Sequence, residues 1–102
     1  MTGNEDHSIT LQEAAAWTKN YRNSVSNGTT IAHAFGGEAI KAILDQEGCV
    51  GIRIYYAIDT AGKKQLIVVG VDSSDNDLYN GLLAERSAPC PSMCSAANPL
   101  NG

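Results

Sequence analysis

The alternation of apolar and polar residues is most regular between Val50 and Val71, and it predicts a β-hairpin. Large side chains occupy every second position of the first segment, as on one face of a strand: Val50, Ile52, Ile54, Tyr56 and Ile58. The stretch from Asp59 to Lys63 fits a three-residue loop, a type I turn closed by Gly62 in a left-handed conformation. That loop sets the register and places Tyr56 opposite Leu66 and Ile54 opposite Val68.

The second strand is apolar on both sides, so both faces of the hairpin need cover. One face combines the alternating residues of the two strands: Ile52, Ile54, Tyr56, Leu66 and Val68. The reverse face carries Tyr55, Ile67, Val69 and Val71, with Arg53 among them. We expect Arg53 either to extend its stem over these neighbours into water or to pair with Glu47 or Asp59 of another subunit. Two helices can cover one face, and the reverse face is predicted to need a partner.

Two amphipathic helices are predicted before the hairpin. Thr10 and Glu13 have the spacing of a capping box, which favours a helix from Leu11 to about Ser24. A second helix is predicted from Glu38 to Glu47, with Gly48 ending it. The predicted core combines the apolar stripes of both helices with one face of the hairpin: Leu11, Ala14, Trp17, Tyr21, Ile40, Ile43, Leu44, Ile52, Ile54, Tyr56, Leu66 and Val68.

The remaining segments are short or irregular. The stretch 29–35 suggests a short edge strand, and 82–84 fits either a strand or a helical turn. Residues 1–8 lack periodicity and are expected to be a disordered N-terminus, and residues 87–102 hold all three prolines in an irregular tail that contains Pro and Cys. The pattern predicts a single α+β domain over 1–102, with two helices packed on one face of a small, mainly antiparallel sheet built around a central β-hairpin.

The net charge and the low number of charged residues limit the kinds of partner that the chain could bind. The chain of 102 residues has a net charge of −4, and only 18% of its residues are charged, which favours self-association over a strongly solvated monomer. Its seven Lys and Arg residues are scattered, so we expect no nucleic-acid partner and no anionic membrane. Without a long apolar run or the features of a signal peptide, the sequence predicts a cytoplasmic protein with reduced thiols.

The cysteines are the strongest candidates for chemistry. Cys90 and Cys94 could present two thiolates to one Zn²⁺, and Cys49 and His33 could complete a tetrahedral set. Zinc patterns usually show two such knuckles, and this chain has one. The alternatives left open are a Cys90–Cys94 disulfide, free thiols, and Cys49 acting as a small buried hydrophobe. A Cys49–His33 nucleophile pair is a further possibility without a local signature.

Three aspartates after the hairpin are spaced like calcium ligands: Asp72, Asp75 and Asp77. A calcium loop of the EF-hand type that began at Asp75 would need glycine at its sixth position and glutamate at its twelfth. Asn80 and Arg86 stand at those positions. The segment is therefore predicted to be a solvated turn.

Several short motifs resemble a group of small bacterial proteins of unknown function. They are Gly48-Cys-Val-Gly-Ile-Arg-Ile-Tyr-Tyr, Ile67-Val-Val-Gly-Val-Asp72, Pro89-Cys-Pro followed by Cys94, and Asn98-Pro-Leu-Asn. The likeness extends over most of the chain after Ser8. It implies a bacterial protein and carries over no activity, ligand or catalytic residue.

The sequence thus predicts a non-catalytic interaction module that self-associates, with a homodimer as the simplest assembly. The alternative is a zinc-binding or thiol-redox protein that uses Cys90, Cys94 and Cys49. No cofactor is expected unless Zn²⁺ occupies that set. Whether the chain is an enzyme stays open, and no small-molecule ligand is assigned.

Overall fold

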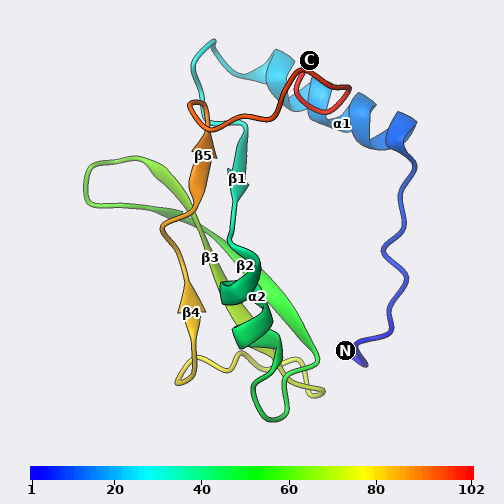
Figure 1. The fold of residues 1–102 in the computed structure, drawn as a ribbon, viewed down its shortest axis with the longest axis vertical. Coiled ribbons are helices and arrows are strands. Elements are labelled where there is room, and N and C mark those ends of the chain that lie inside the picture. Colours follow the sequence, from blue (N-terminus) through cyan, green and yellow to red (C-terminus); the bar gives the residue numbers. More distant parts are fainter. The chain divides into compact units, whose positions relative to one another are not determined.

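A computed structural model describes residues 1–102 and shows an α+β fold of two helices and two antiparallel sheets (Figure 1). The chain divides into two compact units. The first unit comprises Met1–Glu5 and Phe35–Ser87, and the second comprises Asp6–Ala34 and Ala88–Gly102. The predicted fold class and the central hairpin are confirmed. Neither helix combines the length and the apolar character that crossing a bilayer requires.

The first unit is built on a three-stranded sheet in the order β2-β3-β4. Strands β2 (Gly51–Ile58) and β3 (Lys64–Val71) form the hairpin in the predicted register, with Tyr56 opposite Leu66 and Ile54 opposite Val68. In the turn, the Asp59 amide donates to the Lys63 carbonyl at 2.9 Å, and Gly62 has a φ of 83°. The local sequence therefore determined both the turn and the register.

Helix α2 (Gly37–Leu44) contacts all three strands of this sheet, and β4 (Leu83–Ala84) pairs with β3 at Val68 and Val69. The helix ends three residues before the predicted Glu47. A tight turn follows Leu44, in which the Gln46 side-chain amide donates to the Ile43 carbonyl at 2.8 Å. That bond gives a donor to one of the carbonyl groups that have no partner at a helix end, so the helix can end at Leu44 without another turn.

The second unit contains α1 (Leu11–Ser24) and a two-stranded sheet of β1 (Ala32–Ala34) and β5 (Ala88–Cys90). The Thr10 hydroxyl accepts from the Glu13 amide at 3.1 Å, as predicted, whereas the Glu13 carboxylate takes the Thr10 hydroxyl rather than its amide. The tail is irregular beyond β5. It is tied to α1 by a 2.6 Å hydrogen bond from the Arg22 guanidinium to the Leu100 carbonyl.

The buried core is much smaller than predicted. The fully enclosed apolar residues are Ile43, Val68, Val69, Val71 and Cys90. Trp17 is 64% exposed, and no residue of α1 is buried, so the predicted contribution of the first helix to the core was wrong. An amphipathic stripe shows which side of a helix is apolar, but it does not show whether anything covers that side.

Burial of the hairpin follows position along the strands and not the predicted division between its two faces. Far from the turn, Val68 of the predicted core face is buried together with Val69 and Val71 of the reverse face. Near the turn, both faces are exposed: Ile54, Tyr56 and Ile58 on the predicted core face and Tyr55 on the reverse face. The helix on the sheet is short: α2 has eight residues and is about 12 Å long, against about 27 Å for the eight residues of β2. A helix of that length cannot cover the whole strand.

Candidate functional site

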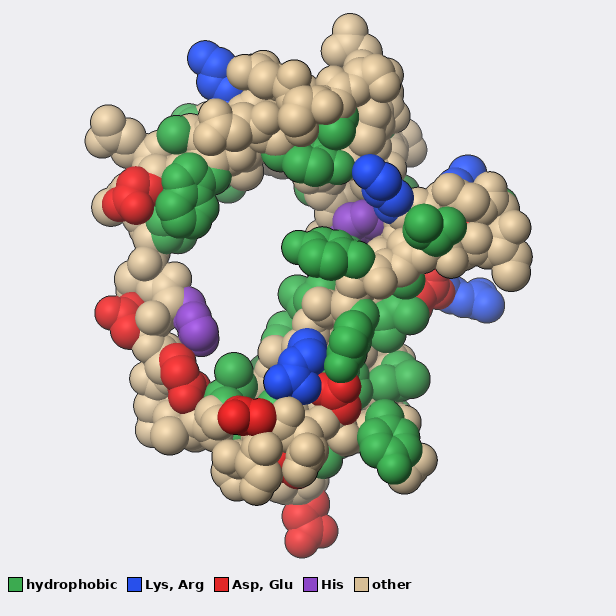
Figure 2. Space-filling view, turned by 180° about the vertical axis from the view of Figure 1, so that it is seen from behind, with side chains coloured by type: hydrophobic (Ala, Val, Ile, Leu, Met, Phe, Trp, Pro, Cys, Tyr) green, Lys and Arg blue, Asp and Glu red, His purple; other side chains and the backbone are tan.

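An apolar feature of the first unit is a row of exposed side chains on β2 near the hairpin turn, here named the hairpin patch: Ile54, Tyr56 and Ile58. They alternate along the strand and therefore share one face. Tyr56 is 93% exposed and Ile58 is 73% exposed. Figure 2 shows apolar side chains gathered over this sheet. A contiguous exposed patch of large apolar residues is typical of an interaction surface.

A polar cluster joins β2 to the loop after β3. The Arg53 guanidinium and the Tyr55 hydroxyl both donate to the Asp77 carboxylate, and Arg53 also donates to the Asp75 carbonyl at 3.2 Å. Asp77 is positioned by the preceding turn, in which the Asp72 carboxylate accepts the amides of Ser74 and Asn76 at 2.9 and 3.0 Å. Arg53 thus has an acidic partner within its own chain.

The electrostatics of this cluster favour a structural role. The Tyr55 hydrogen bond, followed by Arg53, lowers the pKa of the Asp77 carboxyl below its ordinary value. The hydrogen bond to Asp77 in turn raises the pKa of the Tyr55 hydroxyl. Both pKa values move away from neutrality, whereas a general acid or base works best with a pKa near the working pH. The cluster holds β2 and the 72–77 turn together.

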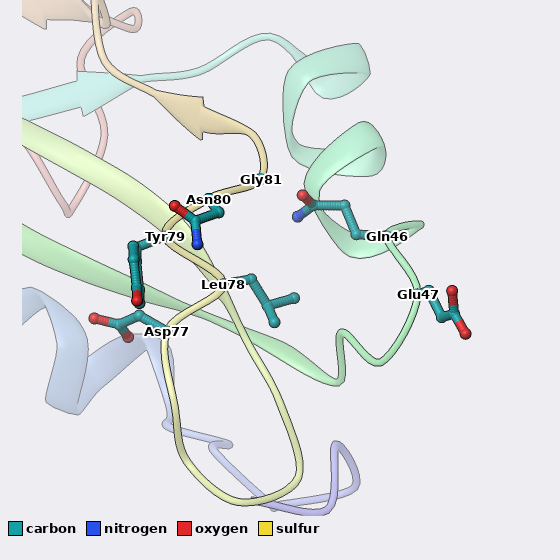
Figure 3. Close-up of a pocket in the computed structure, with 7 residues that line it drawn as sticks. All are labelled: Gln46, Glu47, Asp77, Leu78, Tyr79, Asn80 and Gly81. Carbon is teal, nitrogen blue, oxygen red and sulfur yellow. The ribbon is translucent and has the colours of Figure 1, made fainter.

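A hollow of about 310 Å³ lies between the residues that follow α2 and the segment 77–81 (Figure 3). Its lining residues are Gln46, Glu47, Asp77, Leu78, Tyr79, Asn80 and Gly81. Gln46 spans one side: its amide nitrogen donates to the Ile43 carbonyl, and its oxygen accepts from the Leu82 amide at 2.8 Å. In Figure 3 the Glu47 carboxylate points away from the other lining side chains. The side chains of Gln46 and Asp77 are thus already bonded, and that of Glu47 is turned aside, which leaves Tyr79 and Asn80 as the other polar side chains of the lining.

The candidate thiol residues fall in different units. Cys90 and Cys94 are joined in a disulfide, with Cys90 buried and Cys94 exposed. His33 lies in β1 opposite Pro89, so these three residues belong to the second unit. Cys49 belongs to the first unit, where its free thiol donates to the Gly51 carbonyl at 3.2 Å. The structure contains no group of three or more His, Cys, Asp or Glu side chains that could hold a metal ion.

Sequence reasoning missed the partnership of Arg53, Tyr55 and Asp77. Arg53 and Tyr55 are two residues apart and share the reverse face of β2, so a common partner could have been anticipated. Which acid binds Arg53 and Tyr55 depends on how the 72–77 turn folds back toward the end of β3. The turn brings Asp77 into a bridge with Val71, and no periodic pattern encodes that bridge.

No protein-family model matches the chain, and neither the comparison with curated proteins nor that with solved structures gives a significant match. A proposal of function therefore depends on the residues and geometry described above.

Proposed function

We propose that this chain is a non-catalytic interaction module that self-associates through its hairpin, most simply as a homodimer. The observation that carries the proposal is the exposure of Tyr56 between Ile54 and Ile58 on one face of β2. A second copy would present the same patch, and the two patches can contact each other across a twofold axis.

The expected affinity is modest. Fully burying one large apolar side chain is worth roughly 1.5–3 kcal/mol, and Ile54 is only 48% exposed, so each copy gains only part of that value for each patch residue. Association itself costs an estimated 4–15 kcal/mol. Because only part of the burial energy is available to offset this cost, we expect a weak dimer that forms at micromolar or higher concentrations. The low net charge of −4 adds little repulsion between copies.

Replacing Tyr56 with lysine should weaken the dimer by about a hundredfold in Kd, because burial of the ring is lost and each copy gains a charge at the contact. Sedimentation velocity over a concentration series measures the effect. Leu11→Lys is the matched control, since it places the same charge on an exposed apolar residue of the second unit and should leave Kd unchanged. A wild-type chain that stays monomeric at high micromolar concentration contradicts the proposal.

A second candidate function is thiol chemistry at Cys90 and Cys94, with Cys49 as a third sulfur. The Cys90–Cys94 disulfide favours it, because Cys94 is an exposed residue that an external thiolate can approach. In that exchange the Cys90 thiolate leaves, and a second external thiol completes the reduction, so two thiols are oxidised for each disulfide opened. We also propose a bacterial cytoplasmic setting, where reduced thiols would be free to bind Zn²⁺.

The thiol candidate predicts either one equivalent of zinc in reduced protein purified without chelator, or one cysteine far more reactive than a free thiol. Metal analysis and the kinetics of alkylation measure these quantities. A metal-free protein with ordinary thiol reactivity removes this candidate and leaves the interaction module standing.

A further inference from the structure

Strand β2 has an open edge. In the sheet order β2-β3-β4 it pairs only with β3, so the backbone groups on its outer side have no strand beside them. Proteins usually protect such edges with charges, proline or bulges. The eight residues of β2 contain neither lysine nor proline, and their single charge, Arg53, is bound to Asp77. This edge is open to pairing.

The turn determines which backbone groups face outward. Asp59 donates to the Lys63 carbonyl, and hydrogen-bonded pairs alternate along an antiparallel ladder. Ala57, Tyr55 and Arg53 therefore direct their N–H and C=O groups toward β3. The outward groups are those of Ile54, Tyr56 and Ile58, which are also the residues of the hairpin patch. The free hydrogen-bonding groups and the exposed apolar side chains thus belong to the same three residues.

The N-terminal segment of the first unit limits this edge at its start. Gly3 lies beside Val50, since a Cβ on Gly3 would stand 2.8 Å from the Val50 carbonyl oxygen, and the Met1 sulfur lies against Gly51. Ile52 is half-buried. The accessible part of the edge therefore runs from about Arg53 to Asp59.

We propose, as a refinement that rests on the proposed function, that β2 pairs antiparallel with β2 of a second copy about a twofold axis at Tyr56. Tyr56 then faces the partner's Tyr56, and Ile54 faces the partner's Ile58. Each of these pairs exchanges two backbone hydrogen bonds. The two sheets become one continuous sheet with the hairpin patches side by side on one face.

The side chains match themselves in this register, which is the reason for assigning a second copy to the edge and not an unrelated peptide. On the reverse face, Tyr55 stands opposite the partner's Ala57, so a large side chain meets a small one. Arg53, which keeps its bond to Asp77, stands opposite the partner's Asp59, so opposite charges lie near each other at both ends of the contact. Moving the axis to Tyr55 would place the partner's Ile58 beside Ile52, next to Gly51 and the Met1 sulfur, and would lose the pairing of Arg53 with aspartate.

Amide hydrogen exchange of the wild-type full chain, followed by NMR at two concentrations, tests the edge. The Tyr55 and Ala57 amides should be protected at both concentrations because they bond to β3. The Ile54, Tyr56 and Ile58 amides should exchange at least about tenfold more slowly when sedimentation shows a dimer. A dimer whose outward amides stay unprotected overturns the edge assignment while self-association stands. A chain that is monomeric at both concentrations overturns both proposals.

Cysteine cross-linking tests the register. In a Cys49→Ser background, two Tyr56→Cys copies would have Cα atoms about 5.5 Å apart, within disulfide reach. Two Ala57→Cys copies would face the partner's Tyr55 instead, with their own Cα atoms beyond the limit of about 7 Å. At concentrations where both variants sediment as dimers, Tyr56→Cys should cross-link at least tenfold faster under mild oxidation. Equal rates, or faster cross-linking at position 57, overturn the Tyr56 axis.

Discussion

Replacing Ile43 with alanine is expected to cost the first unit about 2–5 kcal/mol of unfolding free energy. Ile43 is the only buried residue of α2 and is 1% exposed. The helix has only two turns, and other apolar residues have little chance to fill the cavity. Urea unfolding followed by far-ultraviolet circular dichroism measures the loss.

Leu44→Ala provides a matched control for this substitution. It stands next in the same helix and has a similar volume, but it is 43% exposed. It should therefore cost clearly less, about 1 kcal/mol, because a smaller part of its apolar surface is removed from water than at Ile43. Equal losses from the two substitutions would contradict the view that Ile43 anchors α2 to the sheet.

Gly70→Ala is expected to destabilise the first unit by about 1–3 kcal/mol through overpacking. Gly70 is buried in β3, and a Cβ there would stand 2.9 Å from the Cys49 sulfur, 3.1 Å from the Gln46 amide nitrogen and 3.3 Å from a Leu78 methyl carbon. These neighbours connect β3 to the segments on either side of the hollow, so a displacement of Gln46 also endangers its hydrogen bond to the Leu82 amide. Chemical unfolding again reports the change.

Two further variants separate overpacking from a general effect of removing glycine. Gly37→Ala adds a methyl group at the start of α2, where nothing lies within 4 Å, and should stabilise the unit by about 0.4–1 kcal/mol. Cys49→Ala removes the nearest atom to the new methyl group and should recover part of the loss in a Gly70→Ala background. An undiminished loss in the double variant would locate the cause elsewhere.

The sequence predicted best those features that a few neighbouring residues determine. The Thr10 cap, the start of α1 and the turn from Asp59 to Gly62 all follow from side chains within four residues of one another. The hairpin register then follows from the turn. These are local hydrogen-bonding problems with few solutions, so a single sequence suffices.

The sequence could not predict what covers each apolar surface. Trp17 and Tyr56 both lie on regular apolar stripes, yet both are exposed. The burial of Tyr56 depends on the length and placement of α2. That helix ends earlier than its pattern suggested, because the Gln46 side chain caps it. The partner of Arg53 was missed for a related reason: Asp77 reaches it through a turn made by side-chain hydrogen bonds.

The candidate thiol residues show the same difference between features that neighbouring residues determine and features that depend on distant residues. The spacing of Cys90 and Cys94 allowed a disulfide or a shared metal, and the structure joins the two sulfurs. Whether Cys49 or His33 could add to that pair depended on long-range folding, which the spacing of residues along the chain does not encode.

The position of the only tryptophan bears on how folding can be observed. Its indole stands largely in water already and belongs to the unit that lacks the hairpin. Its emission should therefore change little on denaturation. An unchanged tryptophan fluorescence would not show whether the three-stranded sheet β2-β3-β4 has unfolded.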